Sequence, residues 1–142
     1  MCTIDTLIFS NNSLNSVKQK FLEPLFRSFR NNYRLAVLRF SFNQIANHTA
    51  SHIFSAAAGC YALNTLNLSD NIIGDSGLET AARLLSEAAH LTTLNLENNR
   101  ISDIGVRHIC YGACLLCARA LDFAAATMIV AYPGCQHQDT EL

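Results

Sequence analysis

Apolar and polar positions along the chain follow one frame that occurs four times. An asparagine holds a fixed place in that frame, at Asn12, Asn43, Asn71 and Asn99. The frames read IDTLIFSNNSL from Ile4, LAVLRFSFNQI from Leu35, LNTLNLSDNII from Leu63 and LTTLNLENNRI from Leu91. The asparagines are 31, 28 and 28 residues apart. A repeat of this period predicts a stacked array of similar units, and it favours binding over catalysis as the function.

Each frame predicts a short strand followed by a turn. The last two apolar positions before the asparagine lie two residues apart, which is the spacing of a strand. One such strand cannot bury its apolar side, whereas stacked parallel strands merge their leucine rows into a core. The asparagine amide has two donors and an acceptor. We therefore expect a ladder of amides to satisfy buried backbone groups, at roughly 1–3 kcal/mol for each partner lost.

The stretches between the frames predict helices. After Ile73, Asp75 or Ser76 is a suitable N-cap, and Ser76 with Glu79 has the spacing of a capping box. Apolar residues then recur with a helical period at Leu78, Ala81, Ala82 and Leu85. After Ile101 the pair Asp103 and Gly105 repeats the pair Asp75 and Gly77. In the first unit we expect a helix from Ser16 to about Arg30, with a kink or restart near Glu23 because Pro24 lies inside it.

The frame L-x-x-L-x-L-x-x-N-x-I/L in a helical unit of 28 residues resembles the leucine-rich repeat, of the subclass of ribonuclease inhibitor and of NOD-like receptors. The resemblance spans roughly residues 4–128 and implies an α/β solenoid of four to five units, with parallel strands on the concave face and helices on the convex face. We place the units near residues 4, 35, 63 and 91, with a degenerate one near 118, in a domain of residues 1–132. Residues 133–142 follow as a flexible tail. The fifth frame is expected at Ala118, Leu121, Phe123, Ala126 and Met128, with Ala126 in place of the asparagine.

Composition narrows the classes of function. Half of the residues are apolar and 15% are charged, which excludes a disordered chain. The net charge of −1 argues against nucleic acid as the partner. No phosphate-binding loop or catalytic constellation occurs, so we expect neither an enzyme nor a cofactor. The first residues lack the apolar region of a signal peptide, and six cysteines are then expected to be reduced thiols in the cytoplasm or nucleus.

Side chains between the leucines point away from the core and form the candidate binding surface. In relatives of this architecture the concave face commonly binds proteins, so the resemblance implies a protein partner there. The residues that we expect to contact this partner are Arg39, Ser41, Thr65, Asn67, Ser69, Asp70, Thr93, Asn95, Glu97 and Asp122. We expect charge complementarity with the partner from the basic Arg39 and from the acids Asp70, Glu97 and Asp122.

Two sets of potential metal ligands are better explained without a metal. His108, Cys110, Cys114 and Cys117 have ligand-like spacing, but no second C-x2-C pair accompanies them. We expect the three cysteines to share a helix face and to pack as small apolar residues. His48 and His52 lie one helical turn apart with no third ligand nearby in sequence, which favours a solvated helix surface.

Three further segments have an alternative interpretation. The helix of the first unit has Phe21, Leu22, Leu25, Phe26 and Phe29 on one side and is either a membrane-surface helix or, as we favour, a helix packed on the sheet. Residues 114–132 are nearly apolar, but Arg119 and Asp122 oppose a membrane span, and the fifth unit explains the same residues. The C-terminal Thr140 and Leu142 suit a PDZ groove, a pattern short enough to occur by chance.

Together these patterns predict a non-catalytic protein-interaction module. One alternative is a GTPase regulator, because Ran-activating proteins share this repeat type. The other is a structural fragment of a longer array with no independent role, since terminal units normally carry a dedicated cap and neither end shows one.

Overall fold

The strands form one parallel sheet in chain order. A computed structural model describes residues 4–17, 19–30, 32–87, 91–119 and 127–129. The strands are β1 (Thr6–Ile8), β2 (Val37–Arg39), β3 (Thr65–Asn67), β4 (Thr93–Asn95) and β5 (Thr127–Ile129). Each pairs in parallel with the next, so that Leu7, Leu38, Leu66 and Leu94 stand side by side. The expected α/β repeat solenoid is thereby confirmed.

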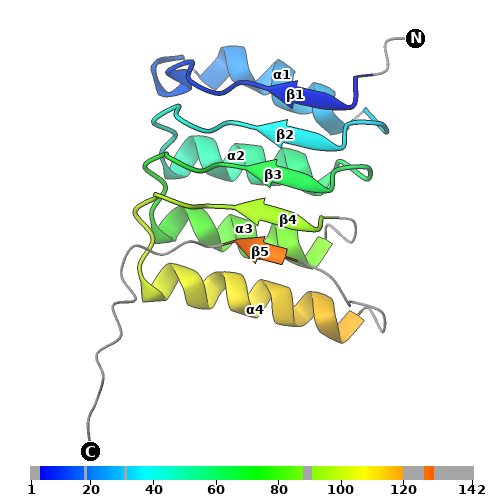
Figure 1. Cartoon of the computed structure of the whole chain (residues 1–142), viewed down its shortest axis with the longest axis vertical. Coiled ribbons are helices and arrows are strands. Elements are labelled where there is room, and N and C mark those ends of the chain that lie inside the picture. Colours follow the sequence, from blue (N-terminus) through cyan, green and yellow to red (C-terminus); the bar gives the residue numbers. More distant parts are fainter. Residues whose placement is uncertain (1–3, 18, 31, 88–90, 120–126, 130–142) are drawn as a thin grey trace, which may run out of the picture.

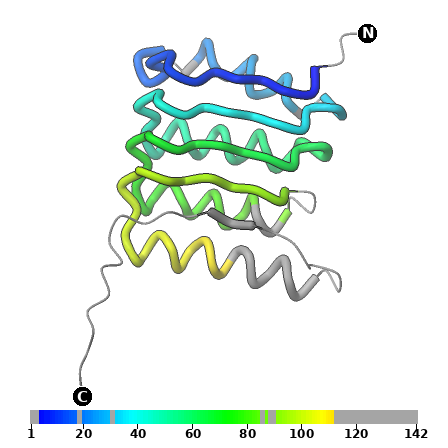
Figure 2. Tube along the Cα trace, in the orientation of Figure 1, coloured from blue at the N-terminus to red at the C-terminus, as the bar shows by residue number. Residues whose placement is uncertain are grey.

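A helix follows each of the first four strands and lies behind the sheet (Figure 1). The helices are α1 (Gln19–Arg30), α2 (Asn47–Ala58), α3 (Asp75–Glu87) and α4 (Asp103–Arg119), and a short 3-10 turn, η1 (Leu14–Ser16), precedes α1. Consecutive turns of the chain stack one below the other (Figure 2). The helices therefore cover one face of the sheet, and the other face is left for contacts outside the array.

The core consists of the repeated apolar positions of the frame. Leu38, Leu66, Phe40 and Leu68 are completely buried between the sheet and the helices. In the first two units phenylalanine replaces leucine, and the rings of Phe9 and Phe40 stack with centroids 5.2 Å apart. Burying such side chains stabilises the fold by about 1.5–3 kcal/mol each. The array is thus held together by contacts between neighbouring units.

The four frame asparagines form the predicted ladder. The carbonyl oxygen of Asn71 accepts hydrogen bonds from the backbone N–H groups of Asn43 and Ile45, at 3.0 and 2.9 Å. Its amide nitrogen donates to the backbone carbonyls of Phe40, Leu68 and Ser69. Asn43 makes the equivalent bonds one unit earlier, and Asn99 makes most of them one unit later. Asn43 and Asn71 are buried, whereas Asn12 at the first unit is exposed.

A second ladder, which the sequence did not suggest, joins the starts of the helices. Asn47 accepts a hydrogen bond from the N–H of Gly74 and donates to the hydroxyl of Ser76. Asp75, at the same place one unit later, accepts from the N–H and hydroxyl of Ser102 and from the N–H of Gly105. The expected capping box of Ser76 with Glu79 is therefore wrong, because Ser76 is bonded to the preceding unit instead.

The frame of the fifth unit differs from the prediction. Ala118 lies within α4, and β5 pairs Met128 with Leu94, so the strand position expected for Leu121 belongs to Met128. The distance along the chain between equivalent leucine positions is 28 residues from Leu66 to Leu94 but 34 from Leu94 to Met128. The longer helix α4 delays the strand, and a segment in which most residues are apolar fits several frames equally well. Phe123, Ala126, Asp122 and the tail 133–142 lie outside the described residues.

Helices α1 and α4 each place one side chain differently from the prediction. Leu22, Phe26 and Phe29 of α1 are buried as expected, but Phe21 is 64% exposed because its helical position turns it away from that row. Helix α1 also begins at Gln19 and runs through Pro24 as one helix. In α4, Ile109 takes the inward position and Cys110 is exposed. The side chains of Cys114 and Cys117 lie outside the described part of the structure.

Candidate functional site

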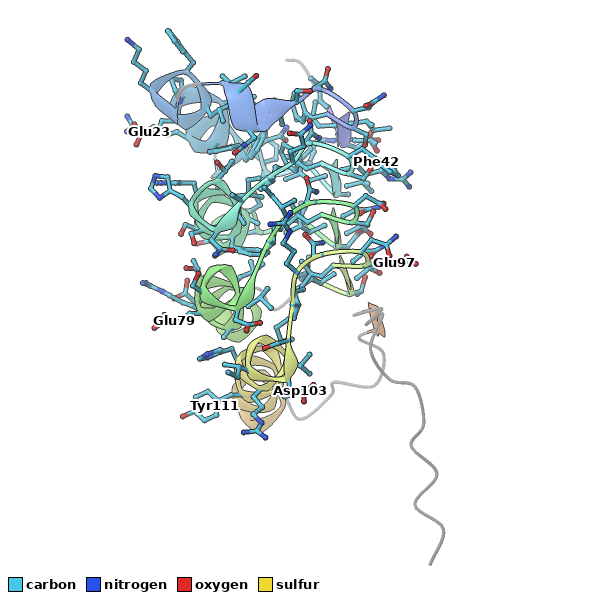
Figure 3. All side chains as sticks on the ribbon, turned by 90° about the vertical axis from the view of Figure 1, so that its left-hand side faces the viewer. Glu23, Phe42, Glu79, Glu97, Asp103 and Tyr111 are labelled. Carbon is cyan, nitrogen blue, oxygen red and sulfur yellow. The ribbon has the colours of Figure 1, made fainter. Side chains whose placement is uncertain are left out.

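The outward side of the sheet, which we call the strand face, carries side chains in registered rows. Its first row is Thr6, Val37, Thr65 and Thr93, and its second is Ile8, Arg39, Asn67 and Asn95. Neighbouring strands lie about 4.8 Å apart, so each row is a closely spaced line across the sheet. Figure 3 shows Phe42 and Glu97 on this side of the molecule, whereas Glu23, Glu79 and Tyr111 lie on the side of the helices.

The amides of Asn67 and Asn95 are fixed by their own backbone. The side-chain oxygen of Asn67 accepts a 2.8 Å hydrogen bond from the N–H of Ser69, and that of Asn95 accepts a 2.9 Å bond from the N–H of Glu97. Only an oxygen accepts from a backbone N–H, so these bonds determine which way each amide points. Within the described part of the chain, neither NH2 group donates a hydrogen bond. Every buried side-chain nitrogen there does have a hydrogen-bond partner. The two NH2 groups are therefore not buried and reach solvent.

The third row, where the strands end, is more enclosed. The hydroxyls of Ser10 and Ser41 are hydrogen-bonded at 2.9 Å, and Ser69 is only 6% exposed. The predicted contact residue Ser69 therefore offers little surface to a partner. Glu97 ends the row and is exposed, while the carboxylate of Asp70 accepts a 2.9 Å hydrogen bond from the amide of Asn98. The two acids thus lie at the adjacent exits of β3 and β4, and Asp122 lies outside the described residues.

Two exposed apolar residues, Ile8 and Phe42, border Arg39. Ile8 is the register partner of Arg39 on β1 and is 61% exposed. Phe42 follows Arg39 by three residues and is 59% exposed. Arg39 is itself exposed and makes no ion pair with any described residue. The sequence interpretation did not select Phe42 as a contact, although its place just before a ladder asparagine was a usable signal.

Phe42 also has a backbone conformation that is unfavourable for its residue type. The residue before each ladder asparagine has a positive φ, and these residues are Asn11, Phe42, Asp70 and Asn98, with φ of 62°, 57°, 56° and 53°. Asparagine and aspartate tolerate this left-handed region, whereas a bulky aromatic residue is rare there. No aromatic contact among the described residues involves Phe42, so stacking on another ring does not explain its presence.

Three small hollows lie among the described residues of the helix side. One of about 170 Å³ lies between α1 and α2 and includes Arg27 and His52, and one of about 150 Å³ lies between α2 and α3. Both are smaller than the roughly 300–1,000 Å³ of typical small-molecule sites. A third, of about 390 Å³, is lined by α1 alone and is open to solvent. Among the described residues of the helix side, the two hollows between helices are thus too small for a typical small-molecule site, and the third is open.

Two of the candidate metal ligands, His48 and His52, contact each other. The rings of His48 and His52 pack edge to face with centroids 4.8 Å apart. Within the described ranges, histidine, cysteine and carboxylate side chains form no group of three that is placed to hold a metal ion.

The apolar stretch 114–132 is divided between two elements. Residues 114–119 belong to α4 and residues 127–129 to β5, so the stretch is not a single helix. Among the described helices, none combines the length with the apolar character that crossing a bilayer requires.

Asp75, the first residue of α3, has a pKa that is shifted by its neighbours. The hydroxyl and then the N–H of Ser102 hydrogen-bond to its carboxylate, and the N–H of Gly105 and the charge of His108 add to them, against a smaller opposing effect of burial. These interactions lower the pKa of Asp75 below its ordinary value. Asp75 therefore remains ionised as a structural acceptor between units.

Comparison with known proteins agrees with this geometry. Residues 62–80 and 87–110 match the family model described as a leucine-rich repeat. Among solved structures, leiomodin-1 actin-binding site 2 is similar with a TM-score of 0.57 and 11% identity, covering 81% of this chain and 82% of that one. The C-terminal domain of tropomodulin from Caenorhabditis elegans is similar with a TM-score of 0.52 and 11% identity, covering 82% and 86%. No curated protein matches the chain. The matches and the fold support a leucine-rich-repeat protein.

Proposed function

We propose that this chain is a non-catalytic protein-interaction module that binds a partner through the strand face. The observation that supports the proposal is the registered arrangement of outward side chains over a backbone braced by the asparagine ladder. A surface held in one conformation before binding loses little conformational entropy when a partner docks. The proposed contacts are Arg39, Ser41, Thr65, Asn67, Asp70, Thr93, Asn95, Glu97 and Asp122, and Ser69 is left out because it is buried.

The repeat subclass that we propose is that of ribonuclease inhibitor and NOD-like receptors. Its support is the 28-residue period together with a full α-helix in each of the second and third units, α2 and α3. We further propose that the repeat domain occupies residues 1–132 and that residues 133–142 follow it as a tail.

Affinity capture with matched variants tests the proposed surface. The strand-face variant carries Thr65→Arg and Glu97→Arg, and the helix-face control carries Glu79→Arg and Tyr111→Arg, so both change the charge equally. Glu79 and Tyr111 are exposed on the helix side. We expect the control to capture the same proteins as the wild type and the strand-face variant to lose them. Loss by the control alone, or identical capture by all three baits, would contradict the proposal.

Purified actin and small GTPases serve as defined probes in the same experiment. Leiomodin-1 actin-binding site 2 is similar to this chain in fold, so actin is tested directly for binding. The alternative of a GTPase regulator of the Ran-activating type requires that the chain accelerate GTP hydrolysis by a small GTPase. Unchanged turnover removes that alternative and leaves the interaction module. Gel filtration with thermal unfolding addresses the fragment alternative. A monomer that unfolds cooperatively supports an independent module, whereas polydisperse aggregates support a fragment.

A further inference from the structure

Arg39, Asn67 and Asn95 form one row that presents mainly hydrogen-bond donors. They are register partners on β2, β3 and β4, so they stand in a line across the sheet. Arginine has donors and no acceptor, and the carbonyl oxygens of both asparagines are already engaged by backbone N–H groups. A guanidinium and two amide NH2 groups therefore face outward together. Carboxylates and backbone carbonyls are the groups that satisfy such a row.

Apolar side chains adjoin the charged end of this row. Ile8 stands beside Arg39 in the register, and Phe42 lies at the exit of the same strand as Arg39. Phe42 retains a left-handed backbone that is unfavourable for a bulky side chain, and no described aromatic contact offsets that strain. Residues with a strained backbone cluster at functional sites, including ligand-binding sites. Exposed aromatic and arginine side chains are also the residue types that most often dominate the energy of an interface.

We propose that Ile8, Arg39 and Phe42, with the amide NH2 groups of Asn67 and Asn95, dock an acidic segment of a partner protein that carries an apolar side chain. This inference rests on the proposed function and specifies the chemistry of the partner. The carboxylate of the segment bonds to Arg39, its further acceptors bond to the two amides, and its apolar side chain lies on Ile8 and Phe42.

The acids of the strand face give the docked segment a direction. Glu97 is exposed at the exit of β4, and Asp70 lies at the exit of β3 beside it. A partner carboxylate near these residues is repelled, whereas one near Arg39 on β2 is attracted. The acidic part of the segment therefore lies over β2, and neutral or basic residues lie towards Asp70 and Glu97.

Panning a displayed library of random peptides on the full chain tests this chemistry before any partner has been identified. We expect the enriched peptides to contain aspartate or glutamate together with an apolar residue, and to bind more weakly as the salt concentration rises. Arg39→Glu should weaken their binding by about tenfold or more, as measured by fluorescence anisotropy. The matched control Arg107→Glu, on the exposed side of α4, should leave their affinity unchanged.

Two conservative variants separate a binding role from a structural one. The double variant Asn67→Asp and Asn95→Asp keeps the acceptor for each backbone N–H but replaces each outward NH2 with a negatively charged oxygen, so it should weaken binding while the fold is retained. Phe42→Asn should weaken binding while raising the midpoint of thermal unfolding. Full binding by these variants and by Arg39→Glu overturns the inference.

The outcome also distinguishes this inference from the proposed function. Peptides that lack an acidic preference, yet lose binding when Thr65→Arg and Glu97→Arg are introduced, overturn the acidic partner and leave the strand face as the binding surface. Peptides that are indifferent to every strand-face variant overturn both.

Discussion

The carboxylate of Asp75 accepts a 2.7 Å hydrogen bond from the backbone N–H of Ser102, which belongs to the next unit of the array. The hydroxyl of Ser102 and the N–H of Gly105 donate to the same carboxylate. The starts of α2, α3 and α4 are thereby tied together in sequence, while the asparagine ladder ties the turns that follow the strands. Because both ladders connect successive units, disrupting either one should destabilise the whole array.

Replacing Asp75 with asparagine should make stability less dependent on acid. The pKa of Asp75 is lowered in the folded chain, so its contribution is present above the unfolded pKa of about 3.9 and is lost as the pH falls through the folded pKa. Asn47 shows that asparagine fits the equivalent position. We expect wild type to be more stable than Asp75→Asn at neutral pH and the difference to shrink below about pH 4. Urea unfolding across this range measures it, and a difference that stays constant would contradict the assignment.

Substituting Gly105 with alanine should destabilise the second ladder. An added Cβ would lie 2.5 Å from the carboxylate oxygen of Asp75 and 2.8 Å from a methyl group of the buried Leu78. Asp75 is held by its hydrogen bonds and Leu78 by packing, so the strain should cost about 1–3 kcal/mol. Gly74→Ala is the matched control, because its Cβ would meet nothing closer than 3.5 Å. Equal unfolding free energies for the two variants would show that the Gly105 site has room.

Replacing the buried Asn71 with alanine should cost roughly 2–4 kcal/mol, because several buried backbone groups lose their partner. The same change at Asn12 should cost less, since Asn12 is exposed and its side chain bonds only to carbonyls of its own unit among the described residues. Chemical denaturation of both variants provides the comparison. A larger loss at Asn12 would be inconsistent with a ladder that acts by satisfying buried groups.

Phe42→Asn should stabilise the fold by about 1 kcal/mol, because asparagine tolerates the left-handed backbone that phenylalanine adopts there. Tyr61→Asn is a suitable control, since Tyr61 is 79% exposed and its φ is not positive. Differential scanning calorimetry should show a higher midpoint for the first variant and no gain for the second. A lower midpoint for Phe42→Asn would mean that the ring stabilises the fold.

The strands and the asparagine ladder could be predicted because their signals are local and periodic. Two leucines that lie two residues apart determine which face of the strand is buried. An asparagine at the same place in each frame predicts a hydrogen-bond partner for the buried turn after the strand. The register of Leu38 with Leu66 and Leu94, and the bonds of Asn43 and Asn71, follow from those two patterns.

Other features depend on neighbours that the pattern does not specify. Asp75 before a helix is expected to cap that helix, and only the stacking of units shows that it bonds to Ser102. The helical period groups Phe21 with Phe26, but it does not show which flank of the helix is covered by the rest of the chain. The outward direction of the Asn67 amide depends on its bond to Ser69, which has no signal in the sequence. The mainly apolar segment after α4 fits several strand frames, so the position of Met128 beside Leu94 was not predicted.

An NMR titration of the chain with its captured partner tests most directly whether the strand face is the binding surface. Asn67 and Asn95 each have a side-chain NH2 group with no described acceptor, whereas the NH2 group of Asn71 is buried and donates to backbone carbonyls. We predict large shifts for the NH2 signals of Asn67 and Asn95 and for the backbone around Arg39, with little change at Asn71 and Glu79. Shifts that cluster on α2 and α3 and leave Asn67 and Asn95 unchanged would contradict the account.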